Sequence, residues 1–290
     1  MRKLTHVIAP LAALAMATGC SQAEVEEPAG EESAASDVVL DEVLASDLRA
    51  EDRERDQYRN PAETLAFFQL APDQTIIEYA PGGGWYTRIL APYVAENGQY
   101  IAVSFPAEAA ISLGEDFVAR VREGGETFSA SQSEALGIPA EKLPFYPGNA
   151  VPDELDGTVD RILMIRMMHN LKRWDIDESE IAALRDTLKD DGMLGVVQHR
   201  AKADAPDEYV DGNAGYLKQD EMVAFFEANG FELVDTSEVN ANPKDPANWE
   251  GGVWTLPPSF GFGSQSEEEI AEHTAIGETD RMTLLFKKAG

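Results

Sequence analysis

Residues 75–87, TIIEYAPGGGWYT, carry the pattern on which the interpretation of the whole chain rests. The first six residues form a short, mostly apolar run, which is typical of a buried strand. Pro81 and three glycines at 82–84 follow, and residues 85–90 begin a helix. No Lys-Ser/Thr pair follows the glycines, which excludes a phosphate-binding P-loop. The order of strand, glycine turn and helix predicts the first unit of an α/β sheet.

The same alternation continues along the chain. Strands are predicted at 99–103, 143–146, 160–165, 192–197, 231–239 and 281–286, and helices at 107–123, 177–189 and 218–229. Such alternation predicts a mostly parallel sheet with helices on both faces. The connection 240–280 is rich in Pro and Gly and shows no clear helix, so the last two strands are expected to pair antiparallel. Ligands of such sheets bind at the carboxyl ends of the strands, which here follow Tyr79, Val103, Tyr146, Ile165 and Val197.

Composition and charge restrict the partners. The chain has 290 residues, of which 43% are apolar, and 23 basic against 53 acidic side chains give a net charge of −30. This charge argues against electrostatic binding to nucleic acid or to an anionic membrane, and leaves a small-molecule ligand as the expected partner. The single cysteine, Cys20, excludes an intramolecular disulfide, a cysteine zinc site and an iron–sulfur cluster. Nothing in the sequence fixes the oligomeric state.

The first 48 residues are interpreted as a leader and a tether. Arg2 and Lys3 precede an apolar run at 4–17, which predicts a signal peptide over 1–20. The ATGC ending at 17–20 resembles a bacterial lipobox, which implies a lipid on Cys20; an ordinary signal peptide cut nearby is the alternative. Ser21, rather than Asp, favours the outer membrane, with the protein facing the periplasm. Residues 21–48 hold nine acidic and no basic residues and predict a disordered tether, within which a short helix over 38–48 is allowed. The folded domain is then expected over 49–290.

Four segments together resemble the class I S-adenosylmethionine-dependent methyltransferases. Residues 76–87 resemble motif I of that family, with Glu78 as its acid, Gly82 and Gly84 as its second and third glycines, and Ala80 in place of the first. LKDDGMLGVV at 188–197, EANGFELV at 227–234 and DRMTLLFKK at 280–288 are similar to later parts of the fold. PGGGWYT, RDQYRNPAETL at 55–65 and RMMHN at 166–170 resemble a bacterial secreted subgroup of predicted methyltransferases. The resemblance implies a Rossmann-like, seven-stranded sheet with the last strand antiparallel, and S-adenosylmethionine as cofactor.

The resemblance also implies the cofactor-binding residues. They are Glu78, Ala80, Gly82, Gly83, Gly84, Trp85, Tyr86, Ser104, Asn149, Ala150 and Arg166. Ser104 stands where the family usually has an acid for the ribose hydroxyls, and Asn149 stands at the acid on the adenine side. Alternatively, Glu78 caps the glycine turn without touching a ligand. Likewise, Trp85 and Tyr86 either shape the pocket or pack as core aromatics.

His169 and His199 are the catalytic candidates, because each follows a strand whose carboxyl end should face the cleft. A histidine there can act as a general base, although it can equally pack or cap the next loop. Arg200 follows His199 and has the same alternatives. The two histidines with a carboxylate could form a metal site, but their spacing does not support one, and no metal is predicted.

The charged segment around Arg53, Arg55, Asp56 and Arg59 has two interpretations. One is an exposed helix with local ion pairs. The other is a lid over the cleft, with Arg59 reaching an anionic group of a ligand. Overall, the sequence predicts a methyltransferase-like lipoprotein that uses S-adenosylmethionine on an unknown acceptor. The alternative is a non-catalytic small-molecule-binding lipoprotein on the same fold, which Ser104 favours, whereas the glycine loop and the polar strand ends favour the enzyme.

Overall fold

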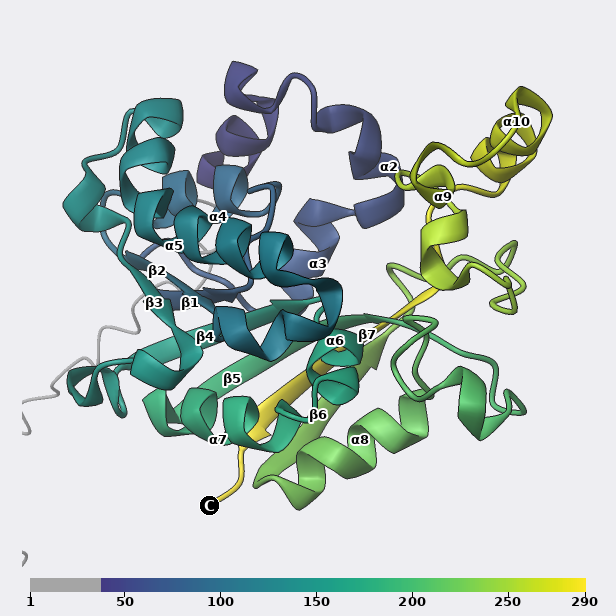
Figure 1. Cartoon of the computed structure of the whole chain (residues 1–290). Helices are drawn as coiled ribbons and strands as arrows, with labels where there is room; N and C mark the ends of the chain where they lie inside the picture. Colours follow the sequence, from purple (N-terminus) through teal and green to yellow (C-terminus); the bar gives the residue numbers. More distant parts are fainter. Residues whose placement is uncertain (1–37) are drawn as a thin grey trace, which may run out of the picture.

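The computed structural model describes residues 38–290 (Figure 1). The predicted signal peptide, Cys20 and most of the predicted tether lie outside the described residues. Of that tether, residues 38–45 are helical, and Leu40 packs into a core cluster with Leu65 and Phe68. This is the short helix that the sequence allowed over 38–48, and it joins the folded part of the chain.

A seven-stranded sheet forms the centre of the molecule. Its order is β3-β2-β1-β4-β5-β7-β6. The strands are β1 (Thr75–Tyr79), β2 (Gln99–Ser104), β3 (Phe145–Pro147), β4 (Val159–Ile165), β5 (Leu188–His199), β6 (Phe231–Ser237) and β7 (Arg281–Lys288). Pairs among β1 to β5 are parallel, and β7 lies antiparallel between β5 and β6. The sheet therefore has the predicted Rossmann-like methyltransferase fold, with the last strand antiparallel as expected.

Helices cover both faces of the sheet, because alternate strand residues are apolar on each side. On one face, Ile77, Met164 and Leu194 form a core with α6 (Met168–Arg173), α7 (Asp177–Thr187) and α8 (Gln219–Ala228). On the other face, Ile76 and Leu163 pack against α3 (Pro61–Phe67), α4 (Thr87–Val94) and α5 (Glu115–Leu136). Figure 1 shows α3, α4 and α5 on one side of the sheet and α6, α7 and α8 on the other. No helix within residues 38–290 is both long and apolar enough to cross a membrane.

Short helices lie before β1 and in the loops. They are η1 (Asp47–Arg49), η2 (Arg53–Arg55), α2 (Asp56–Arg59), η3 (Ala107–Leu113), η4 (Ala140–Lys142), η5 (Gly148–Ala150), η6 (Asp153–Leu155), η7 (Asp207–Tyr209), η8 (Gly252–Thr255), α9 (Phe260–Gly263) and α10 (Glu267–Ile276). The helix α10 corrects the expectation that 240–280 contains none. Ser266 and Glu269 form a capping box at its start, which was a readable signal.

The helix predicted over 107–123 is two elements. Gly114, with φ of 96°, separates η3 from α5, and α5 runs on to Gly137 in a left-handed conformation. Gly124 and Gly125 do not end the helix as the sequence suggested. A Cβ on Gly125 would lie 2.6 Å from the ring of Phe145, so this glycine allows α5 to approach β3 closely.

Candidate functional site

The chain leaves β1 through a sharp turn. Ala80, directly after the strand, has φ of 54°, and Gly82 and Gly84 have φ of 56° and 74°. The amide of Ala80 still donates to the carbonyl of Val103 on β2, at 2.7 Å. The glycines adopt the left-handed region without cost, whereas for Ala80 this conformation is strained. The turn thus presents backbone at the carboxyl end of β1, as the sequence predicted.

The neighbouring strand β4 ends in the same way. Arg166 follows it with φ of 59°, and its amide donates to the carbonyl of Val197 at 2.6 Å. β1 and β4 are adjacent and parallel, so the two strained corners lie at one edge of the sheet. Left-handed non-glycine residues of this kind gather at functional sites, where the surrounding structure supports their strain.

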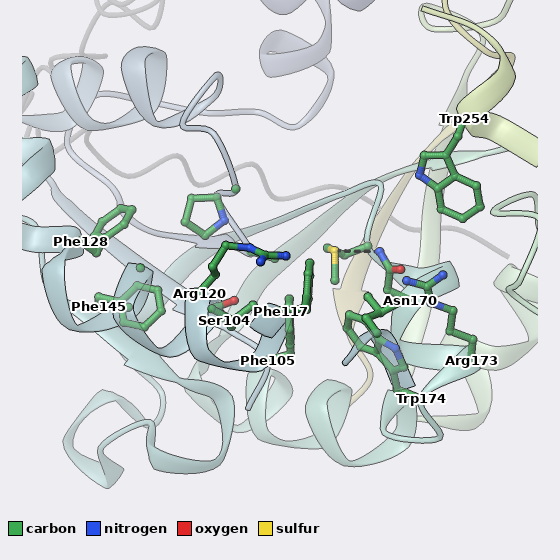
Figure 2. A pocket seen from close by; sticks show the side chains of 18 of the residues that line it. Ser104, Phe105, Phe117, Arg120, Phe128, Phe145, Asn170, Arg173, Trp174 and Trp254 are labelled. Carbon is green, nitrogen blue, oxygen red and sulfur yellow. Dashed lines mark hydrogen bonds between the residues drawn. The ribbon is translucent and has the colours of Figure 1, made fainter. Parts of the chain in front are cut away.

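A first cavity of about 660 Å³ opens between this edge and α5 (Figure 2). Ala80, Pro81 and Gly82 form one wall, and Ser104 and Phe105 at the end of β2 form another. Most of the remaining lining is apolar: Leu113, Phe117, Val121, Phe128, Phe145, Met167, Trp174, Trp254 and Phe262. Figure 2 shows aromatic side chains from both sides of the cavity. An aromatic, mostly apolar chamber suits a purine base.

A second cavity of about 390 Å³ adjoins the first. Six residues line both cavities: Ala80, Pro81, Gly82, Met167, Asn170 and Trp254. The second cavity is polar, because charged residues of the segment before β1 meet the ends of β4 and β5 there. The two chambers of different character therefore join at the turn after β1.

Glu78 lines the second cavity but is held by its own fold. Its Oε2 accepts hydrogen bonds from Tyr100 Oη at 2.6 Å and from Thr87 Oγ1 at 2.8 Å, and the residue is buried. Burial raises the pKa of the Glu78 carboxyl to about 7, against these two hydrogen bonds and the charge of Arg88, which lower it. These bonds tie β1 to β2 and α4, which supports the alternative that Glu78 fixes the turn; a direct role toward the cofactor stays a prediction.

His169 and His199 lie next to each other and line the second cavity. Their ring centroids are 5.5 Å apart; His169 Nδ1 contacts Gln198, and His199 Nδ1 lies 2.6 Å from Thr279 Oγ1. Burial lowers the pKa of His169 to about 3 and that of His199 well below its usual value. Both imidazoles are therefore neutral near pH 7. They can accept a hydrogen bond or a proton, but such low pKa values make weak bases.

The segment before β1 covers the second cavity. Arg59 is 1% exposed, its guanidinium lies 4.6 Å from the ring centre of Trp85, and both side chains line the cavity. Arg59 is therefore not exposed as the exposed-helix interpretation expected, and its role as part of a lid over a ligand stays a prediction. Trp85 and Tyr86 are buried, contact each other and also line the cavity. They therefore pack as core aromatics and shape the pocket at the same time.

Four predicted residues lie elsewhere. Gly84 lines neither cavity, although it shapes the turn. Asn149 and Ala150 are exposed; Asn149 lines an adjoining hollow that shares Phe105, Val121, Gly125 and Phe145 with the first cavity. Arg200 is paired with Asp280 and Glu238, at 3.0 and 2.7 Å, and lines a hollow outside both chambers.

The C-terminal part brings further residues to the site, and among them Glu278 and Thr279 had no assignment from the sequence. Glu278 and Thr279, just before β7, line the second cavity, and Trp254 lies where the two cavities meet. The nearest signal in the sequence was DRMTLLFKK at 280–288, which resembles a later part of the family fold and begins directly after Thr279. Between residues 38 and 290, no group of three or more His, Cys, Asp or Glu side chains is placed to hold a metal ion.

Solved structures of two methyltransferases and of a cyclase are similar to this chain at low identity. A S-adenosylmethionine-dependent methyltransferase from Aquifex aeolicus is 20% identical over 69% of this chain and 93% of its own, with a TM-score of 0.47. The 1,6-didemethyltoxoflavin-N1-methyltransferase of Burkholderia thailandensis, solved with S-adenosylhomocysteine, is 14% identical over 98% and 94%, with a TM-score of 0.47. The [4+2]-cyclase SpnF is 15% identical over 80% of each chain, with a TM-score of 0.49. No family model and no curated protein matches the sequence.

Proposed function

We propose that this protein is an S-adenosylmethionine-dependent methyltransferase. One observation carries the proposal: an aromatic chamber and a polar chamber join at the glycine turn after β1, in a sheet of methyltransferase order. A methyl donor and its acceptor must meet at one point, and a site with two connected chambers brings them together. Positioning of this kind is the main contribution that a protein makes to such a transfer.

The residues of the first cavity fit the cofactor in part. The turn at 80–82 offers backbone without bulky side chains, and Phe105 and Phe117 offer flat apolar surface for a base. Ser104, 8% exposed, lies at the end of β2 and can make a hydrogen bond to a ribose hydroxyl. A serine lacks the charge-assisted bonds that a carboxylate would make there, so we expect weaker binding than with an acid.

The cofactor, when bound, supplies an electrophilic methyl group on a sulfonium. The residues of this chain orient the acceptor and exclude water around it. His169 and His199, neutral and buried, accept hydrogen bonds from a nucleophile in the second cavity. Removal of a proton by either histidine matters only for a nucleophile that must lose one.

Calorimetry tests the proposal. S-adenosylmethionine and S-adenosylhomocysteine are titrated into the purified full-length protein, with adenosine as the control ligand. We expect saturable binding of both compounds, and weaker binding of adenosine, which lacks the amino-acid moiety. Absence of any heat with both compounds up to millimolar concentration would remove the methyltransferase assignment.

The alternative function is a non-catalytic receptor on the same fold. Ser104 in place of an acid favours it, because loss of the ribose contact is expected where selection for this cofactor is relaxed. The two functions differ in one measurement. A receptor binds a small molecule in the second cavity without any effect of S-adenosylhomocysteine, whereas an enzyme binds acceptor and S-adenosylhomocysteine in adjoining chambers.

The location of the protein is a separate proposal. The ATGC ending at 17–20 supports a lipid on Cys20 and a periplasm-facing protein at the outer membrane. Cys20→Ala is expected to release the protein into the soluble periplasmic fraction. A variant that stays with the membrane and is processed identically would contradict the lipid anchor, and Ser21→Ala is the matched control.

A further inference from the structure

Three arginines converge on one carboxylate beside the second cavity. Glu278 lies 2.6 Å from Arg55 Nη2, 3.2 Å from Arg59 Nε and 3.1 Å from Arg281 Nη1. Glu278, Arg59 and Arg281 are each less than 5% exposed. One negative charge cannot neutralise three guanidinium groups, so this cluster carries an excess of positive charge within a chain of net charge −30.

Arg59 has unused donors. Its Nε contacts Glu278, but its buried Nη1 and Nη2 have no hydrogen-bond partner among the described residues 38–290. Its guanidinium is fixed over the ring of Trp85 and lines the second cavity. A buried donor without a partner is costly, and more so on a charged group. Fixed donors on a cavity wall are what a ligand with acceptor oxygens would satisfy.

Arg166 adds a further cation from the opposite element. It follows β4, is half-buried and lines the same cavity. Within residues 38–290 no carboxylate forms an ion pair with it. Burial, and next to it the charge of Arg166, lower the pKa of Arg59 to about 9, which shows that the two guanidinium groups interact.

The other charged groups of the cavity do not cancel this excess. Arg88 is paired with Asp52, with Nη2 2.9 Å from Oδ1, so these two contribute no net charge. Glu78 has a pKa raised to about 7 by burial, and is therefore only partly ionised. His169 and His199 are neutral. The wall formed by Arg55, Arg59 and Arg166 remains cationic.

We propose that the second cavity binds an acceptor through an anionic group, a carboxylate or a phosphate, held by Arg59 and Arg166. The assignment of the anion to a methyl acceptor rests on the proposed function, whereas anion binding itself does not. Guanidinium groups bind both kinds of oxyanion through paired N–H donors. The small volume of about 390 Å³ restricts the acceptor to a small acidic molecule.

The test measures anion binding directly. Inorganic phosphate and acetate are titrated into the full-length protein by calorimetry at constant ionic strength, with chloride as the reference salt. We expect saturable binding of at least one of them. Arg166→Gln and Arg59→Gln should weaken it by about tenfold, a change of about 1.4 kcal/mol. Arg166→Lys keeps the positive charge but not the paired N–H donors of the guanidinium group. Its affinity for the anion should lie between that of Arg166→Gln and that of the wild type.

Arg53→Gln is the matched control. Arg53 belongs to the same segment, but its side chain is 41% exposed and lies outside the cavity, and this variant should bind phosphate and acetate as the wild type does. Circular dichroism and thermal unfolding identify variants that fail to fold. If Arg59→Gln fails to fold, Arg166→Gln still tests the anion site, because this substitution breaks no ion pair.

Titration of S-adenosylhomocysteine separates the possible sources of the anion. If the cluster serves the acceptor, Arg166→Gln leaves the affinity for S-adenosylhomocysteine unchanged, and phosphate or acetate binds equally well when S-adenosylhomocysteine is saturating. An equal loss of S-adenosylhomocysteine affinity, or competition between the two, would overturn the acceptor assignment. No binding of phosphate and acetate to the wild type would overturn the anion site. Failure of S-adenosylhomocysteine to bind, with anion binding intact, would remove the proposed function alone.

Discussion

Arg59 Nε donates to Glu278 Oε2 over 3.2 Å, and this buried pair joins the segment before β1 to the start of β7. Burial by itself raises the pKa of the Glu278 carboxyl, but Arg281 and Arg59 outweigh it and lower the value to about 2. The carboxylate is therefore ionised at all physiological pH values. It fixes the arginines in place without neutralising them, which leaves their remaining donors to a ligand.

Glu278→Gln should destabilise the protein, because it leaves several buried guanidinium groups without a carboxylate. Breaking a buried ion pair from one side costs about 3–5 kcal/mol. Added phosphate should then raise the melting temperature of the variant more than that of the wild type, since it replaces the lost charge. Thermal unfolding with and without phosphate measures both effects. Glu238→Gln, on an exposed carboxylate that pairs with Arg200, is the control and should show neither.

Glu78→Gln should change how stability depends on pH. The pKa of Glu78 is about 7 in the folded protein against an ordinary 4.5, so the folded state holds its proton over this range and the unfolded state does not. The free energy of unfolding should therefore fall as pH rises from 4.5 to 7, by about 3 kcal/mol at most. The variant lacks this decrease. Urea unfolding of both proteins at pH 5 and pH 8 compares them, and equal pH dependence in the two would show that Glu78 titrates normally.

His169→Gln should change the pH dependence of stability in the direction opposite to that of Glu78→Gln. The pKa of His169 is about 3 in the folded protein, lowered by burial from 6.5, so only the unfolded state takes up a proton between these values. The contribution of His169 to the free energy of unfolding should be complete above pH 6.5. The free energy of unfolding should then fall as the pH drops toward 3. The variant should lose its share of this decrease, roughly 1.4 kcal/mol for each pKa unit, while above pH 7 the two proteins differ by a constant. A slope that is unchanged in the variant would mean that His169 is not buried as described.

Ser104→Asp should strengthen cofactor binding if the ribose lies at the end of β2. A carboxylate there accepts charge-assisted hydrogen bonds, which are worth about 1.5–3 kcal/mol, or roughly ten- to a hundredfold in affinity for S-adenosylhomocysteine. Ser104→Ala should weaken binding by only a few fold. Calorimetry of the three proteins should show that the affinity for S-adenosylhomocysteine decreases from Asp to Ser to Ala at position 104. The reverse order would place the ribose away from β2.

Gly82→Val and Gly84→Val form a matched pair. Both glycines have left-handed φ, of 56° and 74°, so each valine introduces backbone strain of about 1–3 kcal/mol. Only Gly82 lines the two cavities. We expect the larger loss of stability for Gly84→Val, because a Cβ there lies 3.0 Å from Arg88 Nη1 whereas one at Gly82 meets nothing nearer than 3.9 Å. A loss of S-adenosylhomocysteine affinity, of about tenfold or more, is expected only for Gly82→Val. If Gly84→Val loses affinity to the same extent in its folded fraction, the turn as a whole, rather than contact at Gly82, controls binding.

The positions of the strands along the chain could be predicted from local sequence. Apolar runs of strand length are set by neighbouring residues, so the strands at 75–80, 160–165 and 281–286 were predicted within a few residues. The meeting of Gly82, Arg166 and His169 was also predictable, because adjacent parallel strands end at the same edge. Helix α10 was not predicted, although Ser266 and Glu269 form its capping box, because Pro and Gly are frequent in the residues around it.

Other features depended on contacts between distant segments. Residues 53–59, RERDQYR, have the composition of a solvated helix, and nothing local indicates that Arg59 is buried. Its burial follows from Glu278 and Trp85, which the fold brings beside it. Asn149 resembled a pocket residue by its position after β3, but it is exposed on η5.

Hydrophobic periodicity and backbone conformation are local properties, so the sheet, the glycine turn and the edge at which chemistry is expected follow from the residues of each segment. The division into an aromatic and a cationic chamber depends instead on how distant segments pack together. Charge and burial at a point in space are sums over all segments that meet there. For Arg59 these segments are more than two hundred positions apart, joined only when β7 inserts antiparallel between β5 and β6.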